Sequence, residues 1–214
     1  MTRRSLKRAH LFFTTLIVTA TGLGLGLSPV EGAPSHPPRL TCDNTASTPA
    51  TGTYKRVRVP AGATCYLRGA TVLGNLHAKN PRSVYVIDTE VAHNIKIMGA
   101  TRDVVIGNAG CRLDPHAGNN VMVTKSHNVA ICQESVDNNI KVSQNDGRIS
   151  LFHNKAGRNI SVTKNLAYDA HPGDGTHRRI AAIRFRFNTA GNHNRVRNNA
   201  GRPVLARGNS PHVS

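Results

Sequence analysis

Short runs in which apolar and polar residues alternate return at an interval of about 20 residues, which indicates an internal repeat. Ile95 and Ile97 flank Lys96, and the same arrangement recurs over residues 121–123, 140–142 and 160–162. A period of two residues is typical of a β-strand with one buried face. A second apolar run follows six or seven residues later, over residues 104–106, 129–131 and 149–151. The pattern predicts two or three short strands in each unit.

An asparagine stands directly before the alternating run in each unit. The six positions are Asn75, Asn94, Asn120, Asn139, Asn159 and Asn199. The steps between them are nearly equal, except that the second is longer and the last is about twice the others, so one unit carries an insertion and the last step spans two units. Asparagine tolerates left-handed backbone, and stacked asparagines form ladders of side-chain amides. We predict that these asparagines form a structural ladder rather than a ligand site.

Strands of three to five residues in a repeated unit, with no helical stripe, predict an all-β fold. Because one unit cannot bury its apolar face alone, the units must stack on one another. We expect a right-handed parallel β-helix (solenoid) of about six to seven coils between residues 55 and 205. A β-sandwich lacks a fixed repeat of this length, and a leucine-rich solenoid needs leucines and a helical segment in each repeat. Arg195, Arg197 and Arg202 replace apolar residues of the repeat, which predicts a polar C-terminal cap.

Residues 1–33 have the layout of a secretory signal peptide. A basic segment with Arg3, Arg4, Lys7 and Arg8 precedes an apolar stretch over residues 11–27 and then small residues up to Ala33. A membrane anchor is the alternative, although the apolar stretch contains Thr and Gly. We predict a signal peptide over residues 1–33, a linker over 34–41, one β-helix domain over 42–210 and a tail over 211–214. The protein is then secreted, either extracellular or associated with the cell wall.

Four cysteines follow the predicted signal peptide, at Cys42, Cys65, Cys111 and Cys132. An even number in an exported chain indicates two disulfides, for which three pairings are possible. We favour Cys42 with Cys65 and Cys111 with Cys132, because about one repeat separates the members of each pair. The first pair would close an N-terminal cap. Zinc binding is the alternative, but the sequence has no Cys-x-x-Cys and no matched histidine spacing.

Residues 40–210 resemble a group of exported bacterial right-handed parallel β-helix repeat proteins, which are mostly uncharacterised. The most specific parts of the resemblance are "VPAGATC" over residues 59–65 and "VLGNL" over residues 72–76. Later units depart from the motif, because His93, Asn119, Asn138 and Arg158 replace the Gly before the Asn. The resemblance implies the fold and export, and it brings no catalytic residue.

The chain is strongly basic, with 28 Lys plus Arg against 11 Asp plus Glu. Removal of the signal peptide takes away four basic residues and one acid and leaves a net charge of +14. Such an excess attracts polyanions through a salt-sensitive field. We predict binding of anionic polysaccharide or cell-wall polymer, with non-specific binding of extracellular nucleic acid as an alternative. A basic but partnerless surface is the other interpretation.

The clearest basic segment lies between residues 178 and 188. Arg184 and Arg186 alternate there with apolar Ile183, Phe185 and Phe187, so the arginines are expected to face outward. Arginine pairs well with carboxylates and phosphates. The predicted binding residues are Arg178, Arg179, Arg184 and Arg186.

An enzyme acting on acidic polysaccharide, a lyase or a hydrolase, is the second hypothesis. The insertion over residues 165–179 supplies its candidate catalytic residues, Asp169, His171, Asp174 and His177. The other acids, such as Asp103 and Asp146, do not recur at one phase of the repeat and are typical of turns. The sequence has no phosphate loop, nucleophile elbow or metalloprotease motif. We therefore favour a protein without catalysis, metal or cofactor.

Overall fold

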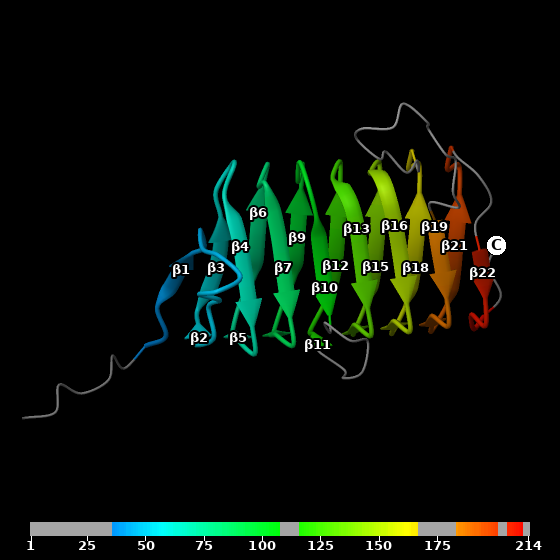
Figure 1. Cartoon of the computed structure of the whole chain (residues 1–214). Coiled ribbons are helices and arrows are strands. Elements are labelled where there is room, and N and C mark those ends of the chain that lie inside the picture. Colours follow the sequence, from blue (N-terminus) through cyan, green and yellow to red (C-terminus); the bar gives the residue numbers. More distant parts are fainter. Residues whose placement is uncertain (1–35, 108–115, 167–182, 201–204, 212–214) are drawn as a thin grey trace, which may run out of the picture. The chain divides into compact units, whose positions relative to one another are not determined.

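The computed structural model describes residues 36–107, 116–166, 183–200 and 205–211. Within them, three parallel sheets carry the strands, here called sheets A, B and C (Figure 1). Sheet A has eight strands: β1 (Arg39–Thr41), β3 (Arg56–Val59), β6 (Leu76–Lys79), β9 (Ile95–Met98), β12 (Asn120–Thr124), β15 (Asn139–Ser143), β18 (Asn159–Thr163) and β21 (His193–Arg197). Sheet B has seven: β4 (Thr64–Arg68), β7 (Ser83–Ile87), β10 (Val104–Gly107), β13 (His127–Cys132), β16 (Asp146–Phe152), β19 (Ile183–Arg186) and β22 (Leu205–Arg207).

Sheet C consists of seven two-residue strands. They are β2 (Thr53–Tyr54), β5 (Thr71–Val72), β8 (Glu90–Val91), β11 (His116–Ala117), β14 (Ser135–Val136), β17 (Lys155–Ala156) and β20 (Thr189–Ala190). From β2 onward the chain passes through sheets C, A and B in turn, and each strand from β2 to β19 pairs in parallel with the strand three places later. The predicted all-β parallel β-helix of about six to seven coils is confirmed.

Aliphatic side chains of successive coils stack in register inside the three sheets. Ile95 lies opposite Val121, which in turn lies opposite Ile140, and all three are fully buried. Along each strand, the residues that alternate with the buried aliphatic ones face outward, as exposed Lys96 does. Burial of one such side chain contributes roughly 1.5–3 kcal/mol relative to exposure. The alternation in sequence therefore corresponds to an inner and an outer face in each sheet.

A ladder of asparagine side chains runs inside the turns between sheets A and B. Asn145 Nδ2 donates to Asn165 Oδ1 at 3.0 Å, and Asn165 Nδ2 donates to Asn199 Oδ1 at 2.9 Å. The same Nδ2 atoms also donate to the backbone carbonyls of Val123 and Val142. Buried polar groups need such partners, so the ladder holds successive turns together.

The position of Asn199 in this inner ladder corrects one prediction. Asn199 was expected to continue the series that begins at Asn75, but its partner is Asn165. The residue that lies beside Asn159 in the next coil is His193, the first residue of β21. The double-length step from Asn159 to Asn199 includes the chain between β18 and β19, so counting along the sequence gives the wrong partner.

A second inner ladder lies in the turns between sheets B and C. Asn154 Nδ2 donates to Asn188 Oδ1 at 2.9 Å, and Asn188 Nδ2 donates to Asn209 Oδ1 at 3.2 Å. At the other end of the ladder, the backbone N–H of Glu134 donates to Asn154 Oδ1. Glu134 thus occupies the place of an asparagine, and its side chain is buried.

The N-terminal end is closed by a disulfide between Cys42 and Cys65, as predicted. The structure extends further toward the N-terminus than expected, because β1 begins at Arg39, within the predicted linker over residues 34–41. Cys132 is also disulfide-bonded. Its predicted partner Cys111 lies outside the described residues, as does the predicted signal peptide. No helix in the described part of the chain is long and apolar enough to cross a membrane.

In the last coil of sheet A, the polar residue that replaces an apolar one is Asn194 rather than one of the predicted arginines. Arg195 and Arg197 are exposed and lie opposite Ser161 and Thr163 on the outer face, not in the apolar column. The inward position opposite Ile160 is held by Asn194. Its side chain is buried and donates to the backbone carbonyls of Ser210 and Pro211. The predicted cap residue Arg202 lies outside the described residues.

Candidate functional site

A column of outward side chains runs across the middle of sheet A, with one residue from each strand from β3 to β21. Arg58 on β3 lies opposite His77 on β6, and His77 lies opposite Lys96 on β9. The column continues through Met122, Lys141, Ser161 and Arg195. Neighbouring strands are about 4.8 Å apart, so the first three members form a continuous row of basic groups. We call these seven residues the central column.

A column of side-chain amides lies beside the central column. Asn94, Asn120 and Asn139 each donate Nδ2 to Oδ1 of the asparagine in the preceding coil at 3.0 Å, and Asn159 does so at 2.9 Å. The first acceptor is Asn75. These five asparagines, the amide column, are five of the six predicted to form one ladder. Each stands two residues before a member of the central column, so both columns belong to the outer face.

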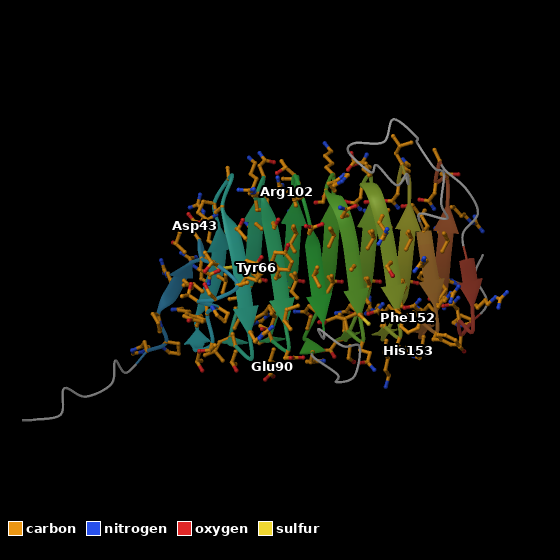
Figure 2. The ribbon with its side chains drawn as sticks, viewed as in Figure 1. Asp43, Tyr66, Glu90, Arg102, Phe152 and His153 are labelled. Carbon is orange, nitrogen blue, oxygen red and sulfur yellow. A yellow bond between two sulfur atoms is a disulfide. The ribbon has the colours of Figure 1, made fainter. Side chains whose placement is uncertain are left out.

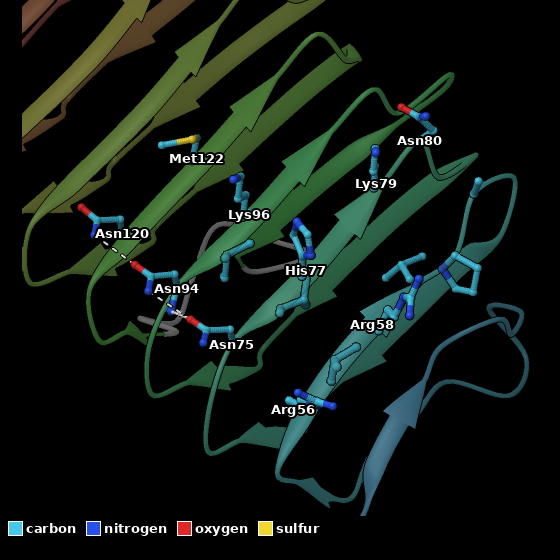
Figure 3. A pocket seen from close by; sticks show the side chains of 16 residues that line it. Arg56, Arg58, Asn75, His77, Lys79, Asn80, Asn94, Lys96, Asn120 and Met122 are labelled. Atoms are coloured by element: carbon cyan, nitrogen blue, oxygen red, sulfur yellow. Dashed lines mark hydrogen bonds between the residues drawn. The ribbon is translucent and has the colours of Figure 1, made fainter.

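Two adjoining grooves follow these columns along sheet A. The first has a volume of about 1040 Å³, and its lining includes Arg56, Arg58, His77, Lys79 and Lys96 together with Asn75, Asn94 and Asn120 (Figure 3). The second has a volume of about 490 Å³, and its lining includes Lys141, Arg195, His193, Asn139 and Asn159. Both grooves contain Asn120 and Met122 in their walls, so they meet at β12.

The cations on this face have no acidic partner within the described residues. None of the eight strands of sheet A contains an Asp or a Glu. The two ion pairs found in the described part, His116 with Asp137 and His127 with Asp146, lie outside this sheet. Neighbouring like charges repel one another, and an anionic ligand removes that repulsion. The electrostatics of the grooves therefore favour anions.

The residues predicted to bind on the basic segment are only partly within the described chain. Arg184 is exposed on the outer face of sheet B, as expected from the alternation. Arg186 is half-buried, and its Nε has no hydrogen-bond partner in the described structure. Arg178 and Arg179 lie outside the described residues.

Phe187 departs from the predicted alternation of this segment. It was grouped with the inward residues Ile183 and Phe185, but its side chain is 45% exposed and its φ is 54°. The chain turns there at the end of β19, so the period of two residues no longer applies. Phe187 stacks on His153 with ring centroids 4.9 Å apart. Phe152, which is labelled beside His153 in Figure 2, packs edge-on against both rings.

The predicted catalytic candidates Asp169, His171, Asp174 and His177 lie outside the described residues. In the part that the structure describes, no group of three or more His, Cys, Asp or Glu side chains is placed to hold a metal ion. The described structure therefore adds no observation in favour of the enzyme hypothesis.

The best-defined acid and base pair of the described residues lies at the turn between sheets A and B. His127 Nδ1 is 2.9 Å from Asp146 Oδ1, and both side chains are partly exposed. One coil earlier, Asp103 accepts hydrogen bonds from Asn128 Nδ2 at 3.1 Å and from the Tyr85 hydroxyl at 3.4 Å. Burial, the hydrogen bond to Tyr66 and the charge of Asp103 together raise the pKa of Tyr85 to about 12. These contacts tie neighbouring coils together at the turn.

The central column was not predicted as a site, although the sequence contains a signal for it. Its members from β6 to β18 stand two residues after each asparagine of the amide column: His77, Lys96, Met122, Lys141 and Ser161. Once the asparagines are assumed to stack, these residues must stack as well. Without that assumption they are recognisable only as the outward residues of alternating strands.

No model of a known protein family matches the chain. No curated protein and no solved structure matches it either.

Proposed function

We propose that the protein binds anionic polymers outside the cell through the outer face of sheet A, without catalysis. The observation that carries this proposal is the row Arg58, His77 and Lys96, one basic residue in each of three consecutive coils, on a sheet without acidic residues. The resemblance to exported β-helix repeat proteins and the signal-peptide layout support the location. The polymer is a constituent of the cell envelope or its surroundings.

A polymer suits this face better than a small ligand does. The basic positions extend from Arg58 on β3 to Arg195 on β21, so a small anion contacts only a fraction of them. Each contact of an exposed cation with an anion is weak, but contacts along one chain act together. Association then depends on the number of basic residues covered and decreases with added salt.

The test compares two triple variants that lose the same charge. The first combines Arg58→Ser, Lys96→Ser and Lys141→Ser in the central column. The second, the control, combines Arg68→Ser, Lys155→Ser and Arg207→Ser, which are exposed residues on sheets B and C. Sodium polygalacturonate and single-stranded oligodeoxythymidine are the probes, and binding is measured by calorimetry at several salt concentrations.

The sheet A variant is expected to lose at least tenfold in affinity, and its salt dependence should become shallower by about one slope unit for each contact removed. The control should lose only the small part due to net charge. Equal losses in the two variants would reject sheet A as the binding face. Retention of the polymer that does not change with salt would reject the proposal altogether.

A further inference from the structure

We infer that the polymer is an acidic polysaccharide lying along the solenoid axis, with its carboxylates on the central column and its hydroxyl groups on the amide column. This inference rests on the proposed function and adds the chemical class of the ligand. It rests on an observation that is independent of net charge: the amide column, a second column of polar groups, lines the same grooves.

The amide column lines the grooves and retains unused hydrogen-bonding capacity. A side-chain amide has two N–H donors. Each asparagine of the amide column from Asn94 to Asn159 uses one of them in its hydrogen bond to the asparagine of the preceding coil. The described structure gives the second N–H of Asn94 and of Asn120 no protein acceptor. Both residues line the first groove and are only half-buried. N–H donors of two consecutive coils are therefore available to a ligand in the first groove.

The two columns share one repeat distance. Each coil from β6 to β18 adds one amide and one member of the central column, and coils follow one another at about 4.8 Å. From β9 onward the basic members stand on alternate coils, at Lys96, Lys141 and Arg195, which gives about twice that distance. A ligand that satisfies both columns repeats an anionic group along one edge and hydroxyl groups along the other. An extended chain of sugar acids carries a carboxylate and hydroxyl groups on every residue, so it presents both kinds of group at a regular repeat.

Nucleic acid fits the same face less well. Proteins that bind single strands stack the bases on aromatic side chains. None of the eight strands of sheet A contains Phe, Tyr or Trp. A flexible polyanion is also disfavoured, because ordering it along a straight row costs more conformational entropy than ordering a stiff sugar chain.

The test uses three probes matched in number of charges. They are oligogalacturonate, oligoglutamate, which has carboxylates but no hydroxyl groups, and oligodeoxythymidine. We expect wild-type protein to bind oligogalacturonate at least tenfold more tightly than either of the others. Equal affinity for oligoglutamate, or tighter binding of oligodeoxythymidine, would overturn this inference while leaving polyanion binding by sheet A intact. Failure to bind any of the three would contradict the proposed function itself.

A pair of asparagine variants locates the hydroxyl contacts. Asn94→Ala removes an amide from the groove, and Asn138→Ala removes a similar inter-coil amide bond, from Asn138 Nδ2 to Asn119 Oδ1, that lies outside both grooves. Asn94→Ala should weaken oligogalacturonate several-fold and leave oligoglutamate unchanged, whereas Asn138→Ala should change neither. Equal weakening of both probes by Asn94→Ala would contradict a role for the amide column in sugar recognition. If Asn94→Ala does not fold, the comparison of probes on wild-type protein still decides.

Discussion

Asn154 and Asn188 are 34 residues apart in sequence, yet their side-chain amides are hydrogen-bonded at 2.9 Å in neighbouring coils. The backbone N–H of Asn154 also donates to Asn188 Oδ1, at 3.1 Å. Ile149 and Ile183 are paired in the adjoining strands β16 and β19, so the coils are in register although the connection between them is long. The inner ladder therefore fixes the position of the strand that follows this connection.

Replacement of Asn188 by alanine should destabilise the protein strongly. Asn188 is fully buried and also donates to the backbone carbonyl of Leu151 and to Asn209 Oδ1. Loss of its side chain leaves several buried polar groups without partners, and each costs about 1–3 kcal/mol. We expect a loss of about 3 kcal/mol in the free energy of unfolding, measured by urea denaturation. The control is Asn192→Ala, at an exposed turn residue, and a similar loss there would contradict a special role for the ladder.

Glu134 should make the stability of the protein decrease as the pH rises. Burial raises the pKa of its carboxyl from the ordinary value of 4.5 to about 8, and Oε1 has no hydrogen-bond partner in the described structure. Below pH 4.5 the group is protonated in both states. Between these two values the folded state keeps a proton that the unfolded state has released, so the free energy of unfolding falls by about 1.4 kcal/mol per pH unit.

Glu134→Gln removes this titration while keeping the shape of the side chain. The free energy of unfolding of the variant should therefore exceed that of wild-type protein by an amount that grows between pH 5 and pH 8, as measured by urea denaturation across that range. Glu90→Gln removes an equal charge from an exposed strand position and serves as the comparison. A constant difference between Glu134→Gln and wild type at all pH values would show that Glu134 is not protonated in the folded state.

The disulfide between Cys42 and Cys65 should stabilise the N-terminal end of the solenoid. The two cysteines are 23 residues apart, and a crosslink closing a loop of this size stabilises by about 3 kcal/mol in the chain-entropy model. The double variant Cys42→Ala and Cys65→Ala should lose about that amount in denaturant unfolding. Substitution is preferable to chemical reduction, because Cys132 is also disulfide-bonded.

A smaller loss would mean that other contacts hold the N-terminal end. The strongest described candidate is Asn44, whose side chain accepts a hydrogen bond from the Tyr66 backbone N–H and donates to the Tyr66 carbonyl. Adding Asn44→Ala to the double variant separates the two contributions. If the triple variant unfolds with the same free energy as the double variant, Asn44 does not compensate for the disulfide.

The sequence was sufficient to predict the solenoid because the apolar alternation and the asparagines share one period. The outer asparagines were recognisable since each stands directly before an apolar strand. The inner ladders were missed, because Asn145, Asn154 and Asn165 follow polar residues in turn segments and resemble ordinary turn residues. Their role appears only when the coils are stacked, since each one hydrogen-bonds to an asparagine of the next coil.

The central column was missed for a related reason. The central column becomes visible only when the register between neighbouring strands is known, and the sequence of one strand does not give that register. The outer asparagines supply that register as far as β18, but the long connection before β19 breaks the count, as the misplacement of Asn199 shows. Arg195 was accordingly assigned to a cap, whereas its position opposite Ser161 places it in the central column.

The same register predicts a variant with stronger binding. Met122 stands between Lys96 and Lys141 in the central column, and its side chain contributes to both grooves. Met122→Lys joins the basic row on β3, β6 and β9 to Lys141 without touching the core, because position 122 faces outward. Polygalacturonate should bind several-fold more tightly, with a salt dependence steeper by about one unit. The control is Ser150→Lys, which adds the same charge at an outward position of β16 on sheet B. Equal gains from both substitutions would show that net charge alone controls binding, whereas a gain confined to Met122→Lys identifies the continuity of the column as the decisive feature.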